Sequence, residues 1–246
     1  MTEETIVTVI NTRLKSREEV AERTMAFRFE KPADWTFTPG QFMEVTLIDP
    51  PEEDDFSNTR AFSIVCAPQE DVIMCATRLT GSTFKKMLST IPLGTEVKIE
   101  GPFGDLVLHE DASRAAVLLT GGIGITPFRS IVLDAAKRKL PHKIFLFYSN
   151  RRPEDAPFLA DLQKAAKENR NFEFIATMNA MEKSAQPWDG ARGVINQALL
   201  DKYLAGVKSP IYYITGPGGM VKAMHELLTG MGVKEEDMRV EEFPGY

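Results

Sequence analysis

The stretch that decides the fold runs from residue 115 to residue 127 and reads Ala-Ala-Val-Leu-Leu-Thr-Gly-Gly-Ile-Gly-Ile-Thr-Pro. Its apolar start, Ala115–Leu119, predicts a buried strand, and the glycines after it predict a tight turn into a helix. Glycines let the backbone approach a pyrophosphate closely, while the free amides and the helix dipole attract its charge. Pro127 suits the first position of that helix. A strand-to-helix corner without any ligand would read the same, so this turn is weak evidence taken alone.

The alternation of strand, turn and helix continues to the end of the chain. Helices are expected through about residue 139, from residue 153 to about 167, and after the glycine turn at residues 216–219. Alternation of this kind predicts a parallel sheet covered by helices on both faces. Further strands are expected at 143–148, 172–177, 211–214 and 238–241.

A second glycine turn, Thr215-Gly216-Pro217-Gly218-Gly219-Met220, follows one of these strands. Two such turns at the carboxyl ends of parallel strands would border one crevice, where open α/β sheets bind ligands. Met220 has two interpretations, as a contact for a nicotinamide ring or as a core side chain of a helix.

The end of the strand at 143–148 bears on the choice of nucleotide. No carboxylate follows Tyr148 until Glu154, whereas Ser149 and Arg151 are groups that a 2′-phosphate prefers. This favours NADP(H) over NAD(H), with arginines that simply face water as the alternative. The expected nucleotide-binding residues are Gly122, Gly124, Thr126, Pro127, Tyr148, Ser149, Asn150, Arg151, Gly216, Pro217 and Met220.

The first 110 residues alternate with a period of two between short turns. One helix, in which Phe84, Met87 and Leu88 share a face, interrupts them. Six strands and one helix predict a small antiparallel barrel. We therefore expect two domains, 1–111 as the barrel and 112–246 as a Rossmann-like α/β domain. The six barrel strands are expected at 6–10, 24–29, 42–48, 61–65, 72–77 and 97–100.

Composition excludes several classes of protein. The 246 residues are 43% hydrophobic, and their net charge of −6 disfavours a nucleic-acid binder. No apolar stretch is long enough for a membrane span, and the N-terminus lacks a secretory pattern, so a cytoplasmic protein is expected. Two cysteines cannot hold an iron–sulfur cluster, and three scattered histidines do not form a common zinc site. Residues 1–110 hold 11 Lys/Arg against 19 Asp/Glu, so the second half is the better place for a phosphate-bearing ligand.

Two segments of the barrel half can contact a diphosphate. Arg60-Ala61-Phe62-Ser63 begins a strand, and an arginine there can fork onto phosphate oxygens. Gly81-Ser82-Thr83 supplies hydroxyls at the start of the expected helix. An ordinary strand start and a plain helix N-cap are the alternatives.

Together with Gly101-Pro102-x-Gly104, these segments and the two glycine turns stand in the order found in the ferredoxin–NADP reductase superfamily. The chain resembles that family over nearly its whole length. The resemblance implies an FAD-binding antiparallel barrel joined to a nicotinamide-nucleotide domain. It implies hydride transfer between NAD(P)H and FAD.

The resemblance also assigns roles. Arg60 would contact the flavin diphosphate, Phe62 would pack on the isoalloxazine, and Ser63 would hydrogen-bond near flavin N5. Thr126 would sit between flavin and nicotinamide, and Phe243 would shield the flavin, so that Ser63, Thr126 and Phe243 are the expected catalytic residues. The expected FAD-binding residues are Arg60, Ala61, Phe62, Ser63, Gly81, Ser82, Thr83, Thr126, Phe243 and Tyr246.

The sequence departs from the family pattern at three places. Phe62 stands where tyrosine is usual, and Gly216 where many members carry cysteine. Phe243 is followed by three more residues, so the choice between Phe243 and Tyr246 as the aromatic over the flavin stays open.

The resemblance leaves the electron acceptor open. A separate ferredoxin, a flavodoxin-like carrier or an oxygenase component is favoured, because the chain lacks cluster cysteines. One alternative is an FAD-binding electron-transfer subunit of a larger complex, and another is a nucleotide sensor without flavin. A basic patch for an acidic carrier is expected from Arg114, Arg129, Lys137, Arg138 and Lys139.

Overall fold

The computed structural model describes residues 7–50, 52 and 57–243, and it divides into two compact units. The first unit holds Met1–Val107 together with Thr126–Asp134, and the second holds Leu108–Ile125 and Ala135–Tyr246. A stretch of the first long helix of the α/β half therefore packs with the barrel half. No helix among the described residues is long and apolar enough to span a bilayer.

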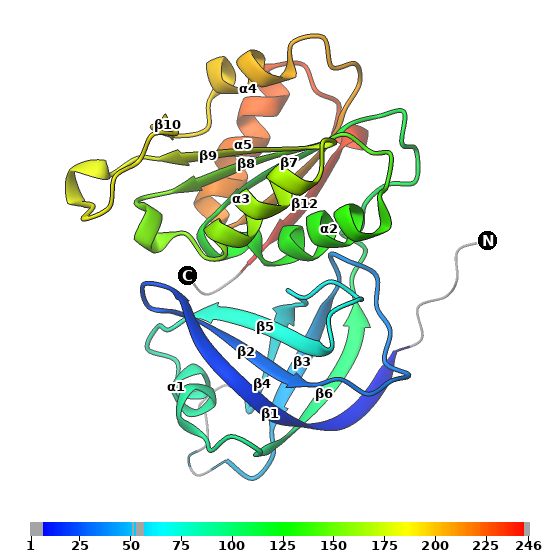
Figure 1. The fold of residues 1–246 in the computed structure, drawn as a ribbon, viewed down its shortest axis with the longest axis vertical. Helices are drawn as coiled ribbons and strands as arrows, with labels where there is room; N and C mark the ends of the chain where they lie inside the picture. Colours follow the sequence, from blue (N-terminus) through cyan, green and yellow to red (C-terminus); the bar gives the residue numbers. More distant parts are fainter. Residues whose placement is uncertain (1–6, 51, 53–56, 244–246) are drawn as a thin grey trace. The chain divides into compact units, whose positions relative to one another are not determined.

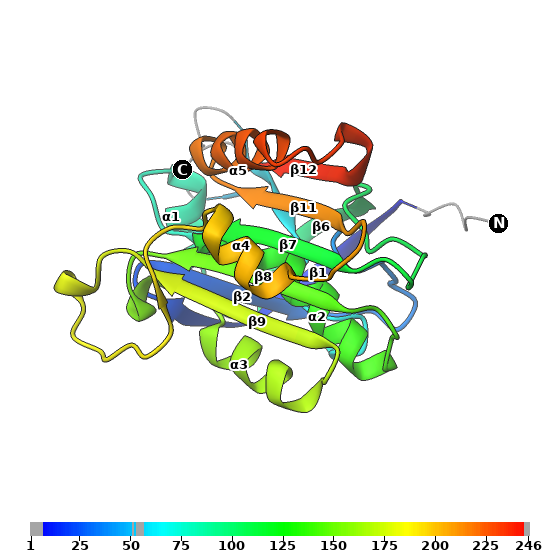
Figure 2. The same ribbon diagram turned by 90° about the horizontal axis from the view of Figure 1, so that it is seen from above.

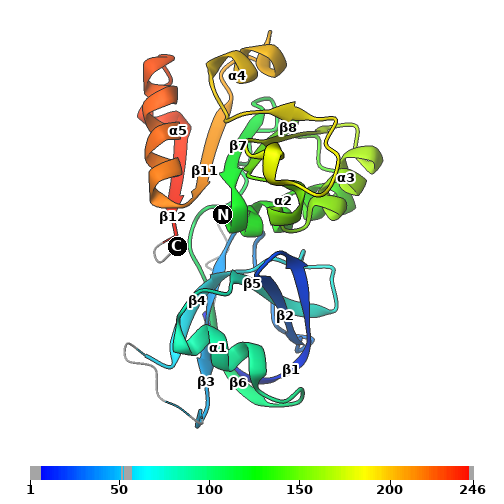
Figure 3. The ribbon, with the colours of Figure 1, turned by 90° about the vertical axis from the view of Figure 1, so that its left-hand side faces the viewer.

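Unit 1 contains an antiparallel sheet with the strand order β4-β3-β6-β1-β2-β5 (Figure 1). Its two outer strands are joined where the Val65 N–H, just after β4, donates to the Met74 carbonyl of β5 at 2.8 Å. This contact closes the sheet into a barrel, around which Figure 3 shows the strands in turn. The elements are β1 (Thr8–Ala21), β2 (Thr24–Glu30), β3 (Phe42–Leu47), β4 (Thr59–Ser63), β5 (Val72–Arg78), α1 (Thr83–Thr90) and β6 (Glu96–Phe103).

The first strand is much longer than expected. The prediction placed it at 6–10, of which Ile6 lies outside the described residues, whereas β1 continues to Ala21. Its second part is polar, and only Thr12 and Leu14 are buried there. Residues 8–13 pair with β6 and residues 14–21 pair with β2, so most of the polar part is a strand because it pairs with β2. Backbone hydrogen bonds to a neighbouring strand do not require alternating apolar side chains, so the sequence of this part carries no period-two pattern.

Unit 2 contains a parallel sheet with the order β10-β9-β8-β7-β11-β12. The chain runs outward from β7 to β10 and then restarts at β11, so the strand order reverses between β7 and β11. Ligands bind at such a switch point in open α/β sheets. The elements are β7 (Ala116–Gly121), α2 (Ile125–Arg138), β8 (Ile144–Asn150), α3 (Leu159–Glu168), β9 (Phe172–Met178), β10 (Ala191–Arg192), α4 (Gln197–Leu204), β11 (Ile211–Gly216), α5 (Gly218–Gly230) and β12 (Met238–Glu242).

Helices cover both faces of this sheet, as Figure 2 shows for α3 on one face and for α4 and α5 on the other. The core under α4 and α5 joins Leu200, Val221 and Leu228 to strand residues such as Leu119 and Ile214. The predicted fold, an antiparallel barrel followed by a Rossmann-like domain, is confirmed.

Two local predictions in this half are wrong, and two elements were not predicted. Helix α2 begins at Ile125 after a short turn at Gly122–Gly124, so Pro127 is its third residue, where a missing N–H still costs nothing. The helix expected from residue 153 is a turn at Pro153–Asp155 followed by α3, because Phe158 adopts a left-handed φ of 59° between them. Helix α4 and the two-residue strand β10 were missed; two residues carry no periodicity.

Candidate functional site

The two glycine turns lie directly against each other. A Cβ atom on Gly124 would come within 2.6 Å of the Gly216 Cα atom, so only glycine allows this approach. The buried Thr215 hydroxyl donates to the Gly124 carbonyl at 2.7 Å and lies 3.1 Å from the Thr120 hydroxyl. The ends of β7 and β11 are thus fixed to each other at the switch point of the sheet.

The N-termini of the two helices that follow differ in charge. No acidic residue lies in the first turn of α2. At α5 the Glu242 carboxylate of β12 lies against Gly218, the first residue of the helix. A carboxylate is favourable there, and it occupies the place an anion would take. The turn before α2 is therefore the better site for a pyrophosphate.

The end of the chain adjoins the second turn. The Phe243 N–H donates to the Gly216 carbonyl at 3.2 Å, directly after β12. Met220 packs on the first turn, since a Cβ on Gly121 would meet its Sδ at 2.6 Å, and it also contacts the apolar core. Gly216, Pro217, Met220 and Phe243 are thus brought together with Gly124, while Tyr246 lies outside the described residues.

Tyr148 forms a hydrogen bond with the first glycine turn. Its hydroxyl lies 3.0 Å from the Gly122 carbonyl and 3.1 Å from the Pro157 carbonyl. The ring is fully buried, and burial raises the pKa of this phenol well above its ordinary value. Tyr148 therefore orients the turn as a neutral donor and does not reach solvent.

Asn150 ends β8 with a buried amide that interacts with the Tyr148 hydroxyl, and this interaction partly offsets the rise in the pKa of the phenol that burial causes. Its backbone carbonyl accepts from the Asn179 N–H at 3.0 Å, and the Arg151 carbonyl accepts from the Ala180 N–H at 2.9 Å. These contacts hold the end of β8 against the segment that follows β9.

The two arginines after β8 differ. Arg152 forms an ion pair with Asp155, with Nε 2.8 Å from Oδ2, so it is held by this chain. Arg151 is exposed, and Ser149 beside it is partly exposed. Arg151 and Ser149 are the groups here that can meet a phosphate in solvent.

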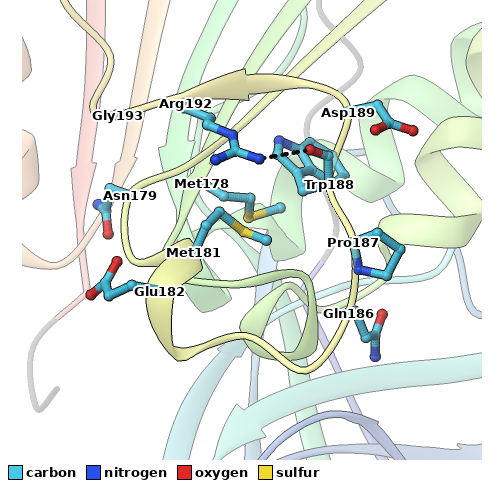
Figure 4. A pocket seen from close by; sticks show the side chains of 10 residues that line it. All are labelled: Met178, Asn179, Met181, Glu182, Gln186, Pro187, Trp188, Asp189, Arg192 and Gly193. Carbon is cyan, nitrogen blue, oxygen red and sulfur yellow. Dashed lines mark hydrogen bonds between the residues drawn. The ribbon is translucent and has the colours of Figure 1, made fainter.

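A pocket of about 630 Å³ opens beyond the ends of β9 and β10 (Figure 4). Trp188 and two methionines supply apolar walls, and the Arg192 guanidinium donates to the Trp188 carbonyl at 3.4 Å. The sequence interpretation missed this pocket. The one local feature that could have indicated it is Trp188-Asp189-Gly190, which follows the end of a strand. Its lining residues are Met178, Asn179, Met181, Glu182, Gln186, Pro187, Trp188, Asp189, Arg192 and Gly193.

In unit 1, Arg60 and Lys85 lie near each other around Phe84. The Arg60 guanidinium stands over the Phe84 ring at 5.3 Å and donates to the Thr59 carbonyl at 2.8 Å. Burial and then the charge of Arg60 lower the pKa of the Lys85 ammonium, whose Nζ lies 3.3 Å from the Thr80 hydroxyl. Two cations placed side by side suit a diphosphate.

Strand β4 carries the rest of the predicted flavin segment. Phe62 and Ser63 are buried and Ala61 is exposed; the Phe62 ring centroid lies 6.0 Å from that of Phe84. The Ser82 hydroxyl caps α1 by accepting the Lys85 N–H at 3.5 Å, which is the N-cap interpretation. Gly81 and Thr83 flank this cap, at an open position and at the start of the helix.

Thr126 and Pro127 begin the part of α2 that belongs to unit 1, the unit that also holds Ser63. One member of the expected basic patch, Arg129, is buried and is not available to a partner, so this part of the prediction is wrong. Arg129 is buried with 6% of its surface exposed, and Arg114 forms an ion pair with Asp237 at 2.6 Å.

Residues 118–226 match the family described as the oxidoreductase NAD-binding domain. The chain is 28% identical over 201 residues to a subunit of the Na(+)-translocating NADH-quinone reductase of Idiomarina loihiensis, and 30% identical over 203 residues to the corresponding protein of Actinobacillus pleuropneumoniae. Each alignment covers 76% of this chain and 49% of the relative. The chain thus spans about half the length of the curated relatives it matches.

Two solved structures share the fold. An Amycolatopsis cytochrome P450 reductase superposes with a TM-score of 0.81 at 21% identity, covering 97% of this chain and 71% of that one. A ferredoxin NADP+ reductase from Neisseria gonorrhoeae, with bound FAD and NADP, gives 0.76 at 19% identity, covering 95% and 98%.

Proposed function

We propose that this chain, which shares its fold with ferredoxin NADP+ reductase and matches an oxidoreductase NAD-binding domain over residues 118–226, binds FAD in its barrel and moves hydride between that flavin and a nicotinamide nucleotide. The observation that carries the proposal is the close approach of the two glycine turns at the switch point of the parallel sheet. The boundary between the two functional parts is proposed at residues 111 and 112.

In this proposal the polar groups of unit 2 bind the nucleotide. Its pyrophosphate meets the amides of the turn from Gly122 to the start of α2, where no carboxylate competes. The adenosine half runs past Asn150 at the end of β8, and its base enters the pocket beside Trp188. Gly216 and Phe243 then border the nicotinamide.

The barrel residues fit FAD. Arg60 and Lys85 offer two neighbouring cations for the diphosphate, with Gly81, Ser82 and Thr83 beside them. Phe62 packs near the ring system, and the Ser63 hydroxyl is buried at the end of β4. FAD, when bound, supplies the redox chemistry, while the protein orients the reactants and excludes water. Ser63, Thr126 and Phe243 are the groups proposed to touch the reacting rings.

For the nucleotide we propose NADP(H), with Ser149 and Arg151 at the 2′-phosphate. NAD(H) is the second candidate. It is favoured by the carboxylates of Glu182 and Asp189 in the pocket, which outnumber the single cation Arg192 there, and by relatives named NADH-quinone reductase.

The electrons are proposed to leave to a separate ferredoxin, a flavodoxin-like carrier or an oxygenase component. Lys137, Arg138 and Lys139 at the end of α2 are exposed and supply the remaining basic patch. The two cysteines, which are buried and form no disulfide, support a cytoplasmic location. A role as the flavin-binding component of a larger complex is the alternative, favoured by the names of the relatives, which are components of a reductase complex.

The test is an anaerobic titration of purified protein, reconstituted with FAD, by NADPH and by NADH. We expect a yellow protein that either nucleotide bleaches, with NADPH the better donor. In Arg151→Ala the preference for NADPH should fall at least tenfold, whereas the exposed Lys164→Ala on α3 should leave it unchanged. A tenfold preference of the wild type for NADH contradicts the NADP(H) assignment, and a protein that takes up no flavin contradicts the whole proposal.

A further inference from the structure

Arg129 is a charged residue buried inside unit 1. Its Nη1 donates to the Val65 carbonyl at 3.1 Å and to the Glu70 carboxylate at 3.1 Å, and its Nη2 lies 3.4 Å from the other oxygen of that carboxylate. The two partners are 64 and 59 residues away in sequence. They belong to the segment after β4, which we call the β4–β5 link, residues 64–71.

Two further side-chain contacts join α2 to the β4–β5 link. The Ser130 hydroxyl donates to the Cys66 carbonyl at 2.6 Å, and the Gln69 amide donates to the Asp134 carboxylate at 2.6 Å. Glu70 also accepts the Ala67 N–H at 2.6 Å, which ties its carboxylate to the link. The helix is therefore held at three successive places along one side.

An arginine is an unusual residue to use for packing alone. Burying a guanidinium is costly unless its donors are satisfied, and an apolar residue of similar size would pack as well at lower cost. The planar guanidinium of Arg129 bonds to both a carboxylate and a carbonyl, so it fixes both the distance and the angle between α2 and the β4–β5 link. The arrangement is thus better suited to fixing an orientation than to adding stability.

The groups on either side of this contact are those of the proposed reaction. Thr126 lies three residues before Arg129 on α2, one helical turn away on a neighbouring position of the same surface. Ser63 is the last residue of β4 and lies two residues before Val65, whose carbonyl accepts from Arg129. Ser63 and Thr126 are both buried, at 8% and 3% exposure, and both belong to unit 1.

We propose that Arg129, held by Glu70 and the Val65 carbonyl, is a positioning residue that sets the start of α2 against the end of β4 for hydride transfer. The proposal rests on the proposed function. It assigns to Arg129 no contact with either cofactor. Reaction rates are sensitive to displacements of about 1 Å between reactants, so a loosened contact acts on the rate of flavin reduction before it acts on binding.

The test compares Arg129→Met with Arg129→Lys and with a matched control, Arg28→Met, which breaks the ion pair of Arg28 with Glu18 in the same unit. In stopped-flow flavin reduction we expect the limiting rate of Arg129→Met to fall at least tenfold, with the dissociation constants of FAD and of the nucleotide within threefold of wild type. Arg129→Lys should recover part of the rate, and Arg28→Met should keep all of it.

Hydrogen exchange of the flavin-free protein gives a readout that needs no activity. Amides of the β4–β5 link should exchange faster in Arg129→Met and not in Arg28→Met. If Arg129→Met fails to fold, Glu70→Gln, which neutralises the carboxylate that Arg129 contacts, and Ser130→Ala, which removes the hydrogen bond to the Cys66 carbonyl, should show a rate loss of the same kind with unchanged binding. A wild-type rate in folded Arg129→Met, or an equal loss in Arg28→Met, overturns the positioning role, whereas a wild type that binds no flavin overturns the proposed function instead.

Discussion

Replacing Gly124 by alanine tests the close approach of the two glycine turns. The added methyl group would lie 2.6 Å from the Gly216 Cα atom, 2.6 Å from the Thr120 hydroxyl and 2.9 Å from the Gly216 nitrogen. Two of these three atoms are backbone, so no side-chain rotation relieves the overlap.

The distances set the size of the effect. Carbon atoms in contact prefer a separation of about 3.5–4.0 Å, so the turns must move apart by about 1 Å. Overpacking of a well-packed site costs about 1–3 kcal/mol. Separation of the turns also weakens the hydrogen bond from Thr215 to the Gly124 carbonyl, and a buried acceptor left without its donor costs about 1–3 kcal/mol more.

We therefore expect Gly124→Ala to lower the free energy of unfolding by at least about 2 kcal/mol, measured by urea denaturation, if the overlap is relieved by movement of the turns. Calorimetric titration should show nucleotide binding weakened at least tenfold. Gly219→Ala is the matched control, because the second position of α5 has no atom within 4 Å of the new Cβ. Alanine there favours the helix by up to about 1 kcal/mol. If Gly124→Ala keeps an unfolding free energy within about 0.5 kcal/mol of wild type and a nucleotide affinity within twofold, the inferred contact between the two turns is refuted.

Three further perturbations address separate parts of the molecule. Lys85→Met should weaken FAD more than FMN in fluorescence titration, because Lys85 and Arg60 are proposed to bind the diphosphate and FMN carries a single phosphate; equal losses for both flavins count against it. Burial lowers the pKa of His109, whose Nδ1 lies 2.9 Å from the Tyr213 hydroxyl, so the unfolded chain binds the extra proton and stability should fall as the pH drops below about 6.5. His109→Gln should flatten that slope in urea unfolding, and an unchanged slope contradicts this assignment. Thr215→Val should cost about 1–3 kcal/mol of unfolding free energy, since it removes the donor to Gly124 at constant shape, and a change below about 0.5 kcal/mol contradicts it.

Local patterns in the sequence were enough to predict the two architectures and their order. Period-two alternation in the first half and the strand–glycine–helix rhythm in the second are local signals, because burial on one face of an element repeats at that element's own period. Gly124 and Gly216 were identified for the same reason, since a tight turn at a strand end demands glycine at a fixed place in the chain.

Which groups meet became visible only in the folded chain. The sequence marks Arg129 as one more exposed cation, and only folding shows that Glu70 neutralises it inside unit 1. Folding likewise places Glu242 on the first residue of α5, and builds a pocket around Trp188 from a loop without periodicity. Polar residues carry no preference for a particular distant partner, so the Arg129–Glu70 ion pair and the polar half of β1 are set by contacts between segments far apart in the chain, and no local pattern records them.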